Sequence, residues 1–115
     1  MPKVMVVDDE NDVVELIKFM LEKDGHEVVT ACNGREALEK VEPAKPDLII
    51  LDIMMPDFDG FYGIEHIKNI NSNAKIIAVT ADQSDDTKQK LKDLKHELII
   101  YKPFDVNTLI KMING

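Results

Sequence analysis

The sequence is poor in cysteine and in aromatic residues. Its 115 residues include one cysteine, Cys32, no tryptophan, two tyrosines and four phenylalanines. A single cysteine excludes an internal disulfide framework, so an apolar core must hold the fold, and a reducing cytoplasm is the expected location. The three histidines (His26, His66 and His96) lack the spacing of zinc ligands, and we expect ordinary core or surface positions for them.

Long apolar runs and an excess of positive charge are also absent. The net charge is −8, which argues against direct binding of nucleic acid or of an anionic membrane. No apolar run approaches the ~18 residues that span a bilayer. The apolar start at 4–7 is cut short by acids, so it is no signal-peptide core. A chain with 44% hydrophobic residues can nevertheless form a real core, and we expect one domain over residues 1–115.

Five short apolar segments alternate with helical patterns along the chain. Most are continuously apolar, which is typical of strands buried on both faces of a parallel sheet. The pattern predicts an α/β fold with a doubly wound, five-stranded parallel sheet, a flavodoxin-like (βα)5 arrangement. Its order, 2-1-3-4-5, is taken from known folds of this kind. The predicted strands are 3–7, 27–31, 47–51, 75–80 and 97–101.

Capping residues mark the ends of the predicted helices. Asn33, followed by Glu36, has the spacing of a capping box, and Pro43 predicts that this helix stops before residue 43. The other signals are Gly25 after the first helix, Gly60 and Ser84 near the starts of the third and fourth, and Asp105 as the cap of the fifth. In the first helix, helical spacing predicts that Val13, Leu16, Ile17, Met20 and Leu21 point inward.

Polar residues stand where four of the strands end. Asp8 and Asp9 follow the first strand, Asp52 the third, Thr80 ends the fourth, and Lys102 follows the fifth. The carboxyl ends of parallel strands share one edge of the sheet, where doubly wound folds bind ligands. Taken singly, each residue is typical of a solvated turn or a local hydrogen bond. Their shared position predicts a site.

Clustered carboxylates repel one another unless a cation neutralises them. Magnesium suits such a site because it prefers oxygen ligands and binds one or two carboxylates together with phosphate oxygens. We expect Asp8 and Asp9 to bind the metal, with Asp52 as a shared ligand and as a nucleophile toward phosphorus. Lys102 would offset charge on the phosphoryl oxygens and Thr80 would donate its hydroxyl.

Four sequence motifs resemble those of receiver domains of two-component response regulators. They are Val7-Asp8-Asp9-Glu10, the segment 51–60 (LDIMMPDFDG), Val79-Thr80-Ala81 and Tyr101-Lys102-Pro103-Phe104. The resemblance covers essentially the whole chain. It implies a signalling switch rather than an enzyme with a separate substrate. A sensor histidine kinase or a His-containing phosphotransfer protein would phosphorylate Asp52, and the switch would act on a downstream protein target.

The resemblance also assigns roles to individual residues. Magnesium would be bound by Asp9 and Asp52 directly, by Asp8 through water and by the backbone carbonyl of Met54. Thr80 and Lys102 would contact the phosphoryl group, beside which the small Ala81 leaves room. Side chains at the positions of Met54 and Asp82 would tune dephosphorylation, and the peptide bond before Pro103 would be cis.

The chain departs from the family pattern near its fifth strand. Ile99 stands where the family usually has a tyrosine or phenylalanine that acts as a rotamer switch, and Tyr101 lies two residues further on. Lys95-His96 replaces the usual Gly-Ala. These changes predict a relay that depends on Thr80 movement and a reshaped fourth-helix segment.

The fourth-helix segment is poor in large aliphatic residues, so we expect it to be among the less stable parts. Its lysines are either a solvated face or a docking patch for a partner; they are Lys88, Lys90, Lys92 and Lys95.

Other functions remain open at this stage. A haloacid-dehalogenase-type phosphohydrolase would need an acid where Met54 stands, and acids at 8–10 would repel the phosphate of a flavin. A degenerate receiver that binds partners without phosphorylation is the more serious alternative. The simplest interpretation is a stand-alone regulator, although a domain of a larger protein would have the same sequence features.

Overall fold

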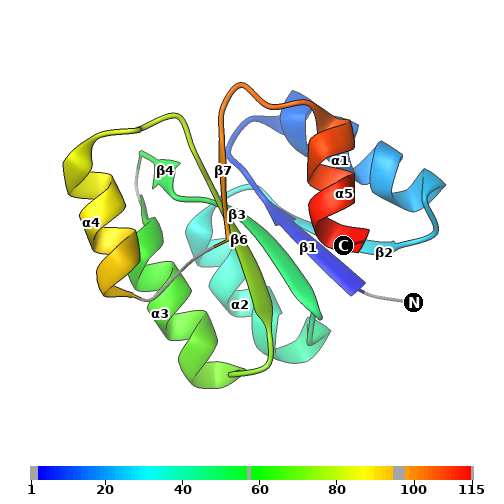
Figure 1. Ribbon diagram of the computed structural model, residues 1–115. Helices are drawn as coiled ribbons and strands as arrows, with labels where there is room; N and C mark the ends of the chain where they lie inside the picture. Colours follow the sequence, from blue (N-terminus) through cyan, green and yellow to red (C-terminus); the bar gives the residue numbers. More distant parts are fainter. Residues whose placement is uncertain (1–2, 57, 95–97, 115) are drawn as a thin grey trace.

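The computed structural model describes residues 3–56, 58–94 and 98–114. Its centre is a five-stranded parallel sheet in the order β2-β1-β3-β6-β7, which confirms the predicted topology (Figure 1). The sheet strands are β1 (Lys3–Val7), β2 (Glu27–Ala31), β3 (Leu48–Asp52), β6 (Lys75–Thr80) and β7 (Ile99–Tyr101). The helices are α1 (Asn11–Lys23), α2 (Gly34–Ala44), α3 (Gly60–Ile70), α4 (Asp85–Asp93) and α5 (Val106–Asn114).

Helices cover both faces of the sheet and enclose two apolar cores. Alternate side chains of each strand point to opposite faces, so Met5 and Val7 belong to one core and Val4 and Val6 to the other. The first core is closed by α2, α3 and α4, and the second by α1 and α5 (Figure 1). Among the described residues, none of the helices combines the length and the hydropathy that crossing a bilayer requires.

Two details of the helices differ from the sequence prediction. Helix α2 runs through Pro43 to Ala44 and is capped by Lys45, whose backbone has a φ of 49°. Pro43 has no N–H, so only one helical hydrogen bond is lost, the one to the carbonyl of Glu39. Because Glu39 is exposed, water can donate to that carbonyl in its place. In α1, Leu16 is 52% exposed, while Val14 takes an inward position.

The predicted capping box of α2 is half formed. The N–H of Glu36 donates to Asn33 Oδ1 at 2.7 Å, as expected. The Glu36 carboxylate, however, accepts from Cys32 Sγ at 3.0 Å and from Lys40 Nζ at 2.7 Å. These two hydrogen bonds, the one from Cys32 first, lower the pKa of Glu36 to about 2. The side chain therefore links Cys32 to the helix instead of closing the box.

A short antiparallel hairpin, which the sequence did not predict, follows β3. It consists of β4 (Met54–Met55) and β5 (Phe58–Asp59). The Phe58 ring lies against Gly34 at the start of α2 and Gly63 in α3. A Cβ at Gly34 would overlap this ring, and one at Gly63 would lie 2.8 Å from it. Because Gly34 in α2 and Gly63 in α3 have no side chains, the Phe58 ring can pack against both helices. This packing anchors the hairpin beside the end of β3.

We expect Gly34→Ala to lower the free energy of unfolding by roughly 1–3 kcal/mol, the usual cost of overpacking. The added methyl must displace the Phe58 ring, because the clash involves its Cγ, Cδ1 and Cδ2 atoms, next to the backbone, and not a flexible end. Urea denaturation would measure the change. In a Phe58→Ala background the same substitution should cost much less, and an equal cost in both backgrounds would contradict the proposed packing.

Candidate functional site

The register of the sheet brings the predicted residues to one edge. Val7 pairs with Leu51, so Asp8 lies beside Asp52. On the other side of β3, Asp52 pairs with Val79, which is followed directly by Thr80. Residue Thr80 pairs in turn with Tyr101, and Lys102 comes next along the chain. The structure therefore brings Asp8, Asp52, Thr80 and Lys102 together at the carboxyl edge.

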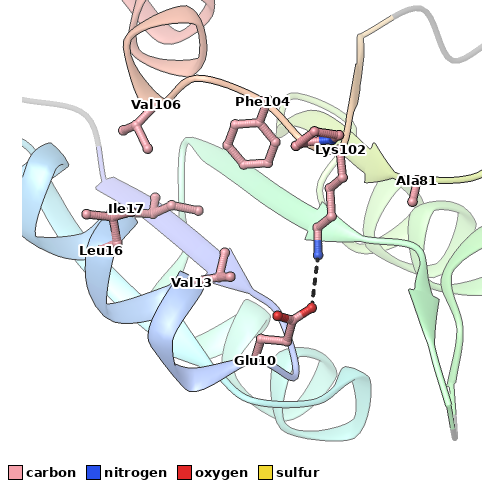
Figure 2. A pocket seen from close by; sticks show the side chains of 9 residues that line it. Glu10, Val13, Leu16, Ile17, Ala81, Lys102, Phe104 and Val106 are labelled. Carbon is pink, nitrogen blue, oxygen red and sulfur yellow. Dashed lines mark ion pairs between the residues drawn. The ribbon is translucent and has the colours of Figure 1, made fainter.

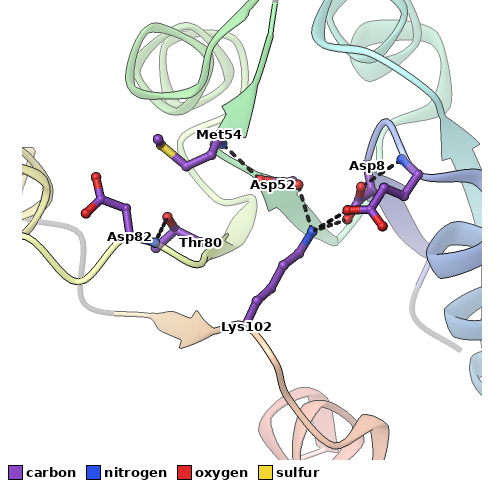
Figure 3. A network of polar contacts seen from close by, with 7 residues as sticks. Asp8, Asp52, Met54, Thr80, Asp82 and Lys102 are labelled. Carbon is purple, nitrogen blue, oxygen red and sulfur yellow. Dashed lines mark hydrogen bonds and ion pairs between the residues drawn. The ribbon is translucent and has the colours of Figure 1, made fainter.

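The ammonium of Lys102 lies between two buried carboxylates (Figure 3). Its Nζ is 3.0 Å from Asp8 Oδ2 and 3.0 Å from Asp52 Oδ2. Those residues are only 3% and 4% exposed. Burial by itself lowers the pKa of Lys102, but hydrogen bonds to Asp52 and Asp8 outweigh it and raise the pKa above its ordinary value. One cation thus faces two anions, and the pocket keeps a net negative charge.

Backbone amides fix the orientation of both carboxylates. The N–H of Glu10 donates to Asp8 Oδ1 at 2.9 Å, and the N–H of Met54 donates to Asp52 Oδ1 at 2.9 Å. Each carboxylate therefore has one oxygen held by the backbone and the other by Lys102. Met54 is 51% exposed, and its side chain extends away from this bond (Figure 3).

Carboxylate oxygens suited to a divalent cation gather after β1. Asp8, Asp9 and Glu10 each offer an oxygen atom, and these atoms lie within 4.8 Å of one another. Asp9 and Glu10 are exposed, and Glu10 Oε1 lies 3.7 Å from Lys102 Nζ. Glu10 was not among the site residues predicted from the sequence, although its place as the third consecutive acid was a usable signal. Hard oxygen donors with excess negative charge fit a magnesium ion.

Thr80 is fully buried at the end of β6, with 0% exposure. Its Oγ1 accepts a hydrogen bond from the N–H of Asp82 at 2.9 Å (Figure 3). The Asp82 carboxylate is engaged with α4, and hydrogen bonds from Thr87 and then Ser84 lower its pKa. Ala81 is exposed next to them, so no bulky side chain covers Thr80 at that position.

Ile99 and Tyr101 occupy alternate positions of β7, so their side chains lie on the same side of the sheet, the side that faces α4. Ile99 is partly buried and packs against the core cluster that contains Leu91 of α4. Tyr101 is partly exposed. The Lys102–Pro103 bond is cis, which confirms that prediction. The predicted departures at Lys95 and His96 lie outside the described residues.

An apolar groove of about 450 Å³ borders the site (Figure 2). Its walls come from α1, with Leu16 and Ile17, and from the turn into α5, with Phe104. Glu10 and Lys102 form the end nearest the carboxylates. The exposed Leu16 thus contributes to the groove wall.

Comparisons with known proteins find related sequences and structures. Residues 4–114 match the family model described as the response regulator receiver domain. The alkaline phosphatase synthesis transcriptional regulatory protein PhoP of Bacillus subtilis is 38% identical over 114 residues, covering 96% of this chain but 48% of that protein. The chain thus spans about half the length of PhoP. Sporulation initiation phosphotransferase F of the same organism is 33% identical over 107 residues, covering 93% of this chain and 86% of that protein.

This chain also resembles a solved structure along almost its whole length. The response regulator protein TrrA of Thermotoga maritima, in complex with Mg(2+)-BeF, is 35% identical, with a TM-score of 0.85 and coverage of 99% of this chain and 97% of TrrA. With the fold, the strand-end residues and these likenesses in agreement, the chain belongs to the response regulator receiver domains of two-component systems, which are signalling domains and not turnover enzymes.

Proposed function

We propose that the chain is a phosphoacceptor switch in which Asp52 receives a phosphoryl group from a histidine kinase or a His-containing phosphotransfer protein. The observation that carries the proposal is Lys102 Nζ at 3.0 Å from both Asp8 and Asp52. The switch would then change the face formed by α4, β7 and α5 and so control a downstream protein. We treat residues 1–115 as one receiver domain acting in the cytoplasm.

Magnesium is the cofactor that the donor set supports. Asp8, Asp9 and Asp52, together with the backbone carbonyl of Met54, would hold it. When bound, the cation supplies positive charge that offsets the repulsion between the carboxylates and the incoming phosphoryl oxygens. The likeness to TrrA, solved with Mg(2+)-BeF, supports this assignment.

The protein's own residues prepare Asp52 for attack on phosphorus. A carboxylate oxygen of Asp52 forms the new P–O bond while the P–N bond of a donor phosphohistidine breaks and the imidazole leaves. The Met54 amide and Lys102 hold Asp52 in one orientation beforehand, which avoids reorganisation during the step. Lys102 then shares its charge with the phosphoryl oxygens, and Thr80 donates its hydroxyl to one of them.

Intact-mass spectrometry after incubation with acetyl phosphate tests the proposal. We expect a magnesium-dependent gain of one phosphoryl group, which is lost in Asp52→Asn because an amide oxygen is a poor nucleophile. Asp47→Asn serves as control, since Asp47 precedes the same strand at its opposite end. No gain in the folded native protein, with a histidine kinase as donor as well, would favour the degenerate receiver.

A second prediction concerns the lifetime of the phosphoryl group. Met54 cannot orient an attacking water by hydrogen bonding, whereas asparagine can, so Met54→Asn should lose the group severalfold faster than the native protein. Since the side chain is 51% exposed, the substitution should leave the fold intact. Met54→Leu, of similar size and without polar atoms, should match the native rate. Equal or slower loss from Met54→Asn would contradict the assignment.

A third prediction follows from the raised pKa of Lys102. The folded chain keeps the Lys102 proton above 10.5, the pKa of a free lysine, where the unfolded chain releases it. The unfolded state then binds fewer protons, so the stability due to Lys102 is complete below pH 10.5 and declines as pH rises through the folded-state pKa. Denaturation from pH 9 to 12 should therefore show a steeper loss of stability for the native protein than for Lys102→Met. Lys111→Met, at an exposed position, should parallel the native curve.

A further inference from the structure

A continuous chain of hydrogen bonds runs from the buried threonine of the site to α4. Thr80 Oγ1 accepts from the Asp82 N–H at 2.9 Å. The carboxylate of the same residue accepts from the Ser84 N–H at 2.8 Å and from Thr87 Oγ1 at 2.7 Å. Asp82 thus contacts the site through its backbone and the helix through its side chain.

This connection matters because α4 buries few of its side chains against the rest of the protein. Among the residues of α4, only Thr87 and Leu91 are buried, so a large part of what holds its first turn is polar. Thr87 is 4% exposed, and its hydroxyl donates to Asp82 while its N–H donates to the Ser84 cap at 3.3 Å. A hydrogen bond to a charged acceptor is stronger than a neutral one. The Asp82 carboxylate is therefore a main anchor of the N-terminal turn of α4.

We propose that Asp82 is a positioning residue that couples Thr80 to α4, so that engagement of the Thr80 hydroxyl by a phosphoryl group on Asp52 loosens the first turn of the helix. When Thr80 turns toward that group, the bond from the Asp82 N–H is strained or lost and the 80–84 turn shifts. The carboxylate then no longer meets Ser84 and Thr87 together. The movement of Thr80 rests on the proposed phosphorylation of Asp52. The hydrogen bonds that couple Thr80 to α4 through Asp82 are present in the unmodified protein.

The apolar packing beneath α4 gives Thr80 no polar link to the helix at position 99. The partly buried Ile99 packs in the apolar cluster beneath α4 and has neither a ring nor a hydroxyl with which to follow Thr80. Asp82 offers a polar route along the neighbouring segment instead. Because coupling is reciprocal, anything that fixes α4 in place should also hold Thr80 in its present position.

Amide hydrogen exchange in α4 tests the coupling without any phosphoryl group. Asp82→Ala and Thr87→Val should each raise exchange at Lys88–Leu91 by roughly three- to tenfold, the effect of one partly exposed charged hydrogen bond. Asp85→Ala removes an exposed acid from the same turn and should change exchange much less. Thr80→Val, which removes the acceptor but keeps the shape, should raise exchange in the native background and have no further effect with Asp82→Ala. If Thr80→Val leaves α4 exchange unchanged, Asp82 is only a cap and the proposal is overturned.

Beryllofluoride with magnesium, a stand-in for the phosphoryl group, then tests the trigger. In the native protein it should raise α4 exchange, and in Asp82→Ala it should add nothing to an already raised rate. An equal response in both proteins would overturn the relay. If the native protein binds no beryllofluoride while the Thr80→Val effect persists, the coupling stands and the phosphoacceptor function fails.

Discussion

The ammonium of Lys102 holds two carboxylates that would otherwise repel each other. Its Nζ lies 3.0 Å from an oxygen of Asp8 and 3.0 Å from an oxygen of Asp52, both buried. Buried charges are costly to desolvate, and a buried ion pair is tolerated only when its remaining atoms are hydrogen-bonded. Backbone amides of Glu10 and Met54 meet that condition. The edge of the sheet is thereby held in a state that is stable yet retains excess negative charge.

The sheet and its hairpin make this arrangement possible. Parallel register places the ends of β1, β3 and β7 at one edge, and the Lys102 N–H donates to the Thr80 carbonyl at 2.9 Å, which fixes where the side chain begins. The Met54 amide that binds Asp52 belongs to the hairpin, and the hairpin is anchored by Phe58 against two glycines. Packing around the Phe58 ring therefore contributes to the orientation of the Asp52 carboxylate.

The sequence predicted the sheet, and the meeting of the strand-end residues at one edge, because both follow from local patterns. Continuous apolar runs mark buried parallel strands, and the residues that follow them must meet at one edge. The hairpin was missed because strands of two residues leave no periodicity. Leu16 was misplaced because helical spacing does not tell which side of a wide apolar stripe faces the core. The direction of the Asp82 carboxylate depends on Thr87, a hydroxyl that the sequence alone does not place near it.

A weakly packed element such as α4 suits the switch that we propose. An element that buries much apolar surface would need many kilocalories per mole to move, whereas segments with few buried contacts open at low free-energy cost. Helix α4 buries only Thr87 and Leu91 among its residues, and its Lys90 pairs with Asp86 on the exposed side at 3.4 Å. The free energy that holds its first turn is thus of the order of a few hydrogen bonds, which is comparable to what the proposed contact between Thr80 and a phosphoryl group would supply. A site can shift an equilibrium only by its differential interaction with the two states, so the sparse packing of α4 and the polar connection through Asp82 are matched in scale.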